Sequence, residues 1–127
     1  MTRRKVMTQK DTNESPLIPV AMQIIIYAGN GRNKALEAVQ LAKNKQLAAA
    51  YQALASAKKE ITLAHQAQTE IIQNEAAGRH YEPSLLFTHA QDHLMTIASE
   101  ISMTENMIEL FEVVLTDAVS SNQPSSI

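Results

Sequence analysis

The chain has 127 residues, a formal net charge of −2 and no cysteine, so its length suits one domain, and disulfides and thiolate sites are excluded. Aromatic residues make up only 4% of it and tryptophan is absent, which favours helices packed on helices over a sheet. No apolar run approaches the roughly 20 residues of a membrane span, and the basic start lacks the apolar stretch of a signal peptide. We therefore expect a cytoplasmic protein that does not insert into membranes.

Basic residues are confined to the first two thirds of the chain. All 11 Lys and Arg lie at or before Arg79, whereas every charged residue after His80 is acidic. Proteins bind nucleic acids by placing Lys and Arg against phosphate, and the C-terminal third offers neither. We expect no nucleic-acid partner.

The first predicted helix begins at Leu17, and the polar residues 1–15 before it are expected to form a disordered tail. Gly29 and Gly31 interrupt its apolar pattern. Because glycine is unfavourable inside a helix, the pair predicts a kink or a close contact with another helix. The cluster at 43–45, Lys-Asn-Lys, suits the end of this helix and a short turn.

The second predicted helix carries its inward residues at alternating steps of three and four, the heptad spacing of helices that cross at about 20° in a bundle. This seam consists of Leu47, Ala50, Leu54, Ala57, Ile61, Ala64, Gln68 and Ile71. Its many alanines imply that the neighbouring helices pack closely. Gly78 then supplies the left-handed cap that ends the helix.

The third predicted helix has Pro83 in its first turn and runs to about Ala118, so that residues 119–127 are expected to form a second disordered tail. One seam along it holds Leu94, Ile97, Ile101, Thr104, Ile108, Phe111 and Leu115. A second seam holds Met103, Met107, Leu110 and Val114 and meets His89, His93 and Thr96 upstream. Residues 16–118 are thus expected to form an all-α, antiparallel three-helix bundle in up-down-up order. The second seam predicts self-association, and a wide core face is the alternative.

His89, Asp92, His93 and Thr96 share one face of the third helix, because residues three and four apart are neighbours there. Histidine and carboxylate are metal ligands, so the patch suits a metal site. Two hydrogen-bonded packing histidines are a second interpretation. A third is a nucleophilic histidine, whose neutral ring has a free lone pair near pH 7. No HExxH motif and no Ser-His-Asp spacing is present, and helical geometry leaves all three open.

The segment 89–96, His-Ala-Gln-Asp-His-Leu-Met-Thr, resembles the signature of the lactose/cellobiose/N,N'-diacetylchitobiose-type IIA component of the bacterial sugar phosphotransferase system. Residues 64–69 are similar to the Ala-His-x-x-Gln-Thr block of that family, and residues 27–32 to its Ala-Gly-Asp/Asn-Ala-Arg-Ser block. The similarity extends over roughly residues 17–117. Gly31 stands where the family usually has alanine.

The resemblance implies a cytoplasmic phosphoryl carrier made of three-helix subunits that assemble as a homotrimer, a nine-helix bundle. Such a carrier accepts phosphate from the histidine-containing phosphocarrier protein. It passes the phosphate to a cysteine of the cognate IIB component, which works with the IIC permease in the uptake of a disaccharide of the cellobiose, diacetylchitobiose or lactose type. His89 falls on the phosphorylated histidine of the family. Asp92 falls on an aspartate that binds one divalent metal ion shared by the trimer, for which Mg²⁺ is the expected ion.

The remaining polar residues of these blocks are expected to support the site. His93 is the candidate helper, and His65, Gln68 and Gln91 are candidate supporting residues. Because the third helix has no arginine, a phosphoryl group on it would be held weakly, which suits a relay. The competing function is that of a non-catalytic oligomeric scaffold or regulatory module with structural histidines, which would not take up acid-labile phosphate.

Overall fold

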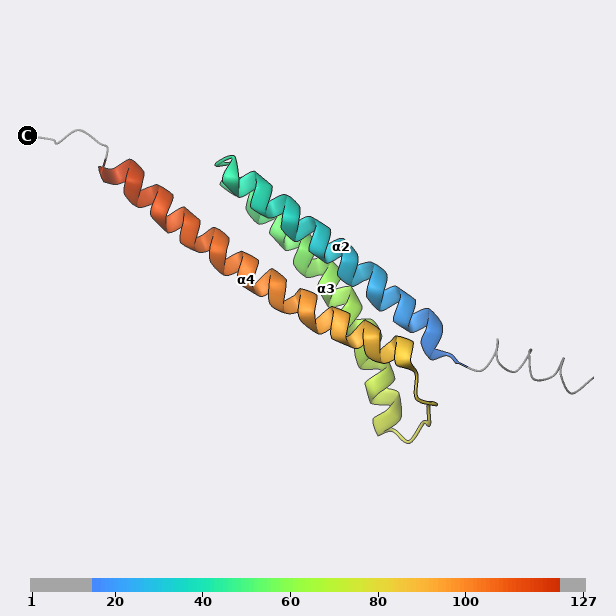
Figure 1. The fold of residues 1–127 in the computed structure, drawn as a ribbon. Helices are drawn as coiled ribbons and strands as arrows, with labels where there is room; N and C mark the ends of the chain where they lie inside the picture. Colours follow the sequence, from blue (N-terminus) through green and yellow to red (C-terminus); the bar gives the residue numbers. More distant parts are fainter. Residues whose placement is uncertain (1–14, 122–127) are drawn as a thin grey trace, which may run out of the picture.

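The computed structural model describes residues 15–121, which form three long helices joined by short connections (Figure 1). They are α2 (Leu17–Lys43), α3 (Leu47–Ala76) and α4 (Leu85–Ser121). α2 and α4 run in the same direction and α3 runs against them, which confirms the predicted up-down-up order. No strand occurs between residues 15 and 121, so the all-α class is confirmed. The tails expected at 1–14 and 122–127 lie outside the described residues.

The two helix ends predicted from local sequence are found where expected. α2 ends at Lys43, and the N–H of Lys45 donates to the carbonyl of Ala42 at 2.9 Å while Lys45 itself has a left-handed φ of 63°. α3 ends at Ala76, and Gly78 takes a φ of 101°. This conformation costs glycine nothing because glycine has no Cβ.

The bounds of α4 differ from the prediction at both ends. The N–H of Phe87 donates to the Ser84 hydroxyl at 3.2 Å, so Ser84 is the N-cap and Pro83 precedes the helix instead of opening it. A serine hydroxyl satisfies a free N–H of the first turn, and this favours the later start. At the other end α4 continues to Ser121, so the tail predicted from residue 119 was wrong for three residues. No glycine or proline between Ala118 and Ser121 stops the helix.

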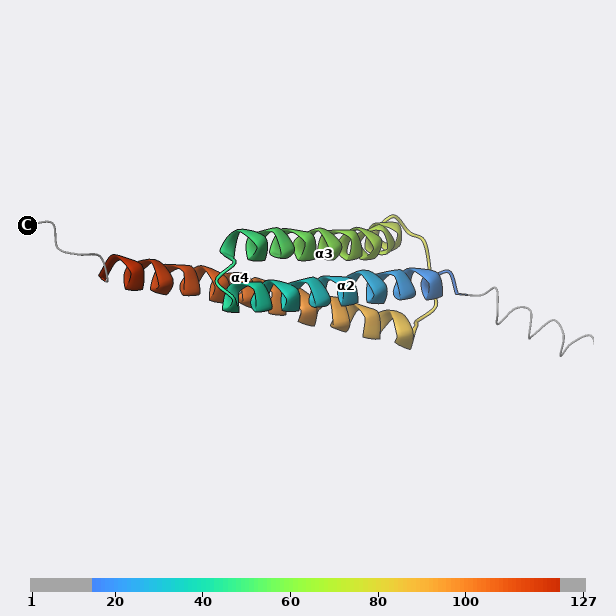
Figure 2. The same cartoon turned by 90° about the horizontal axis from the view of Figure 1, so that it is seen from above.

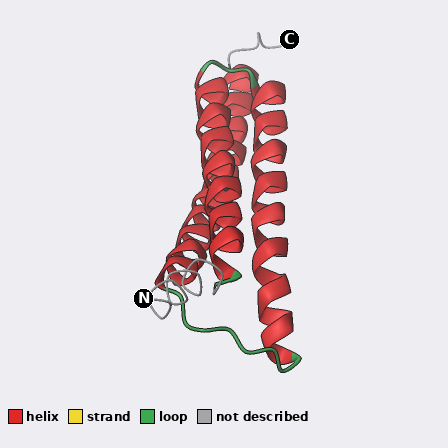
Figure 3. Ribbon diagram, turned by 90° about the vertical axis from the view of Figure 1, so that its right-hand side faces the viewer, coloured by secondary structure: helices red, strands yellow, loops and turns green. Residues whose placement is uncertain are grey.

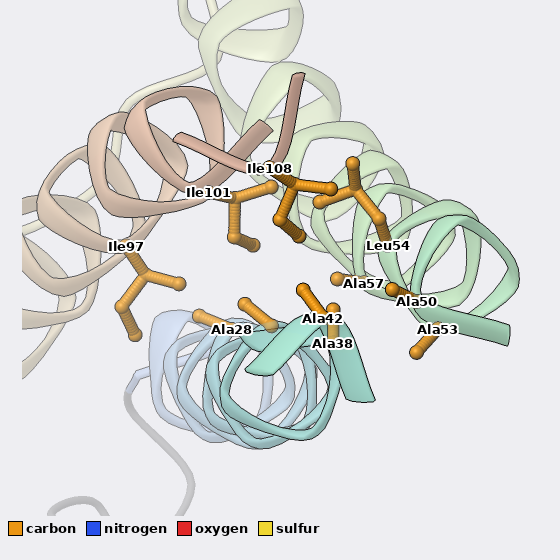
Figure 4. Packing of buried hydrophobic residues seen from close by; sticks show 11 residues of the cluster. Ala28, Ala38, Ala42, Ala50, Ala53, Leu54, Ala57, Ile97, Ile101 and Ile108 are labelled. Carbon is orange, nitrogen blue, oxygen red and sulfur yellow. The ribbon is translucent and has the colours of Figure 1, made fainter. Parts of the chain in front are cut away.

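The core is rich in alanine where α2 and α3 meet, and isoleucines from α4 complete it (Figure 4). The seam predicted for α3 is confirmed, with six of its eight residues buried and the remaining two, Leu47 and Ile61, partly buried against the core. The predicted close contact is at Gly31, where an added Cβ would lie 3.2 Å from the carbonyl oxygen of Ala57. Gly29, in contrast, has open space around it, and α2 is one continuous helix across both glycines.

α4 is held to both neighbours by polar contacts but extends past them at its C-terminal end (Figures 1 and 2). Glu100 pairs with α2, while Glu105 and Glu112 contact α3 through Lys58 and Tyr51. The second seam predicted on α4 is exposed, with Met103, Met107, Leu110 and Val114 each more than half accessible. None of the helices within the described region is long and apolar enough to cross a membrane.

The two connections lie at opposite ends of the bundle (Figure 3). The turn between α2 and α3 closes one end. The longer connection between α3 and α4 closes the other, where α2 also begins. In that connection Asn74 Nδ2 donates to the hydroxyl of buried Tyr81 at 2.9 Å, and the guanidinium of Arg79 lies 4.9 Å from the centre of the same ring. These contacts fix the approach of the chain to α4.

Candidate functional site

The candidate site begins one turn into α4. Ser84 caps the helix, and this sets the direction in which the side chains of the following turns project. His89 is exposed and His93, one turn further on, is half-buried. Their rings stack with centroids 5.7 Å apart and an angle of 28° between the planes. The prediction that these two histidines share one helix face is therefore confirmed.

The polar groups of the patch have no bonding partners in the described part of the chain. Between residues 15 and 121 the side chains of His89, Asp92 and His93 make no hydrogen bond and no ion pair. The interpretation of both histidines as hydrogen-bonded packing residues therefore finds no support there. An exposed imidazole without a partner keeps a ring lone pair available to an incoming electrophile.

The described residues of a single chain do not form a metal site. No group of three or more His, Asp or Glu side chains in residues 15–121 is placed to hold a metal ion. A zinc ion takes three or four protein ligands, and the described part of a single chain does not bring that many together at His89, Asp92 and His93. Asp92 is exposed and provides one carboxylate.

The three candidate supporting residues lie in three different places. His65 is half-buried and lines a shallow polar depression on the surface of α3. The depression is lined by Thr62, His65, Gln66, Thr69, Glu70 and Gln73, all of them from α3. Gln68 is in the core, with only 9% of its surface exposed. Gln91 lines a second depression together with Leu17 and Thr88, beside the start of α4. The depressions that hold His65 and Gln91 do not include His89, so the support expected from these residues stays a prediction.

Arg32, the last residue of the 27–32 block, pairs with Glu100. Arg32 Nε donates to Glu100 Oε1 at 2.8 Å, and Nη2 donates to Oε2 at 2.9 Å, so the pair is bidentate. The hydrogen bond from Arg32 holds the pKa of Glu100 below its usual value, against the effect of desolvation, and the charges of Arg32 and His93 add to the lowering. The two residues are 68 positions apart, so no local sequence pattern predicts that they pair. Only the position of Glu100 on the side of α4 that faces α2 could have indicated the contact.

Comparisons of the sequence and of the structure with known proteins point to the same family. Residues 19–112 match the family model described as the lactose/cellobiose-specific IIA subunit of the phosphotransferase system. The chain is 45% identical over 93 residues to the lichenan-specific phosphotransferase enzyme IIA component of Bacillus subtilis, covering 73% of this chain and 84% of that protein. It is 35% identical over 105 residues to the N,N'-diacetylchitobiose-specific EIIA component of Escherichia coli K12, covering 83% and 89%. The crystal structure of the cellobiose-specific enzyme IIA of Bacillus anthracis is similar with a TM-score of 0.76 and 37% identity, covering 84% of this chain and 97% of that one.

Proposed function

This chain belongs to the lactose/cellobiose-specific IIA family of the phosphotransferase system, and from that membership we propose that it carries a phosphoryl group on His89 during sugar uptake. As a IIA component it is part of a phosphotransferase and works with a IIB partner. We infer that the phosphoryl donor is the histidine-containing phosphocarrier protein, that the acceptor is a cysteine of the IIB component, and that the relay takes place in the cytoplasm. The sugar does not contact this subunit in such a relay. A disaccharide of the cellobiose, diacetylchitobiose or lactose type is the proposed cargo.

The observation that carries this proposal is the exposed, unpaired ring of His89 on a capped helix. In the first step a ring nitrogen of His89 attacks the phosphorus of the donor phosphohistidine. A new N–P bond forms as the old one breaks, and the donor ring leaves with the electron pair. In the second step the IIB thiolate attacks the same phosphorus, forming an S–P bond and releasing the ring of His89. The stacked ring of His93 limits the orientations open to the ring of His89, and this is the helper role that we propose for it.

Phosphoryl transfer in a reconstituted relay tests the proposal. The full chain is incubated with the phosphocarrier protein and its radiolabelled phosphate source, and wild type should gain acid-labile phosphate. His89→Gln should remain unlabelled, whereas His80→Gln, a matched change at an exposed histidine of the connection between α3 and α4, should label like wild type in extent. An unlabelled wild type would support the scaffold function instead. For His93→Ala we expect slower labelling, and unchanged rates in both steps would remove His93 from the site.

Self-association is the second part of the proposal, and we infer that the assembly is a homotrimer. The exposed apolar residues of α4 provide a stripe that one bundle leaves uncovered, and Ile18, Met22, Ile26 and Leu36 of α2 are exposed as well. Sedimentation equilibrium should give three times the mass of one chain. Leu110→Asp, in the centre of the α4 stripe, should shift the equilibrium towards single chains, because it would bury a charge in an apolar contact.

A shared metal ion depends on that assembly. One chain offers a single carboxylate, whereas a divalent ion such as Mg²⁺ takes about six oxygen ligands. Asp92 is exposed and unpaired, so its carboxylate is free to meet copies of itself around a threefold axis, with waters completing the shell. We propose that Asp92 would hold one ion per trimer, whose charge would offset the repulsion of three carboxylates. Metal analysis should then find one ion per three chains in wild type and none in Asp92→Leu.

A further inference from the structure

The first half of α2 carries apolar side chains on the surface of the bundle. Ile18, Met22 and Ile26 are 46%, 45% and 55% exposed, and because they are four residues apart they follow one side of the helix. These three residues form the α2 patch. No charged residue occurs from Leu17 to Gly31. Apolar side chains with no charges among them are typical of the centre of a protein interface, where charged residues are depleted.

The register between α2 and α4 shows where the patch lies. The two helices run in the same direction (Figures 1 and 2), and Arg32 of α2 faces Glu100 of α4. Seven residues make about two turns, so a step of seven returns to nearly the same face of a helix. A step back by seven on both helices pairs Ile25 with His93. The first half of α2 is therefore level with the histidines of α4.

One turn closer to the start of both helices, the same register brings Met22 to the level of His89. Leu17 and Thr88 line one depression, so the two helices are still adjacent at this end. Met22 and His89 are both exposed. Because the axes of packed helices are about 8–10 Å apart, the α2 patch borders the exposed ring of His89.

A protein that takes a phosphoryl group from His89 has to cover this region, because its reactive atom must reach the phosphorus on that ring. A specific interface buries about 800 Å² on each partner, and a disc of that area extends about 16 Å from its centre. The α2 patch is well inside that distance. A second copy of the chain on the patch would obstruct the approach to His89, and the apolar stripe of α4 from Met103 to Val114 is available for self-association.

We propose that the α2 patch is the docking surface for the IIB component, and that its three side chains pack against an apolar area beside the reactive cysteine of that protein. The inference rests on the proposed function, because it takes His89 as the centre of the contact. Burial of the patch contributes affinity without removing any charge from water. Its residues bind the partner and take no part in the chemistry, so they change the affinity for IIB and leave the transfer step unchanged.

Transfer from the loaded chain tests the contact. The full chain is labelled to completion by the phosphocarrier protein and its phosphate source, purified, and mixed with increasing concentrations of IIB. In Met22→Ala/Ile26→Ala the half-saturating concentration of IIB should rise about tenfold, while the maximal rate of transfer stays that of wild type. Alanine favours the helix, so this variant should keep the fold and the wild-type mass in sedimentation equilibrium. Leu63→Ala, which truncates an exposed leucine of α3, is the control and should transfer like wild type.

An unchanged half-saturating concentration in the double variant, or an equal rise in Leu63→Ala, would overturn the inference. A fall of the double variant towards the mass of a single chain would overturn it too, because the patch would then be a contact between subunits. Calorimetric titration of the unphosphorylated chain with IIB separates docking from the relay. The double variant should bind IIB about tenfold more weakly than wild type, and equal binding would refute docking. A wild type that binds IIB but never takes up label would refute the carrier function and leave the docking surface in place.

Discussion

The two glycines of α2 provide a matched test of how closely the helices pack. Replacing either with alanine gains about 1 kcal/mol of helix propensity. At Gly29 an added Cβ has no atom within 4 Å, so Gly29→Ala should keep that gain and stabilise the protein by about 1 kcal/mol. At Gly31 the same Cβ would lie 3.2 Å from the carbonyl oxygen of Ala57 and 3.3 Å from side-chain carbons of Ile61 and Ile101.

The close contact at Gly31 decides whether Gly31→Ala stabilises or destabilises the protein. The two isoleucine side chains can move by a few tenths of an ångström, but the carbonyl of Ala57 belongs to the backbone of α3 and moves only with its helix. Overpacking of this kind costs about 1–3 kcal/mol, so we expect Gly31→Ala to be destabilising by about 1 kcal/mol after the gain in propensity is subtracted. The two variants should therefore differ by about 2 kcal/mol in the free energy of unfolding.

Urea unfolding followed by circular dichroism measures this difference. All three proteins are compared at one protein concentration, because self-association would couple stability to concentration. The slopes with urea should be equal, so that the midpoints report stability alone. A Gly31→Ala protein as stable as Gly29→Ala would refute the argument, since it would show that α3 yields to the extra methyl group at no cost.

Three further outcomes follow from single contacts. Ser84→Ala removes the cap of α4 and should lower the free energy of unfolding by about 1 kcal/mol, whereas Ser84→Asp keeps a capping oxygen and should lower it less. Equal decreases in the two variants, measured by urea unfolding, would contradict the cap. The pKa of Glu100 is lowered by Arg32, so the pair contributes stability above the ordinary carboxyl pKa that is lost as the pH falls through the lowered one. In Arg32→Gln an NMR titration should find the pKa of Glu100 higher, and an unmoved midpoint would argue against the pair. The pKa of Tyr51 is raised to about 12, first by its hydrogen bond to Glu112, so the stability from this bond is present below pH 10 and is lost as the pH rises through about 12. Phenolate absorbance should show an earlier transition in Glu112→Gln.

The sequence predicted the bundle well because its signals are local and repeated. The heptad seam of α3 identified its buried face from Ala50 to Ile71 without knowledge of the partners. Gly78 marked an end because a left-handed residue is needed there. Pro83 was predicted to lie in the first turn of α4 but precedes the helix, because the Ser84 hydroxyl accepts a hydrogen bond from the N–H of Phe87 and so caps it.

The site was predicted less completely because its contacts are between distant positions. The i, i+4 spacing of His89 and His93 is enough to place them on one face, and their rings do stack. The bidentate pair of Arg32 and Glu100 joins residues that share no local pattern. His65 was expected to support the site, and it lines a depression formed by residues of α3 alone.

The position of Arg32 bears on how the relay would release its phosphoryl group. A guanidinium at the ring of His89 would bind the phosphate oxygens in the ground state and slow their transfer to the next carrier. The bundle instead uses this arginine to join α2 to α4, well beyond the histidine. Ser84 thus caps the helix that carries His89, and because α4 contains no lysine or arginine, a cation that stabilises a phosphoryl group there would have to come from outside α4.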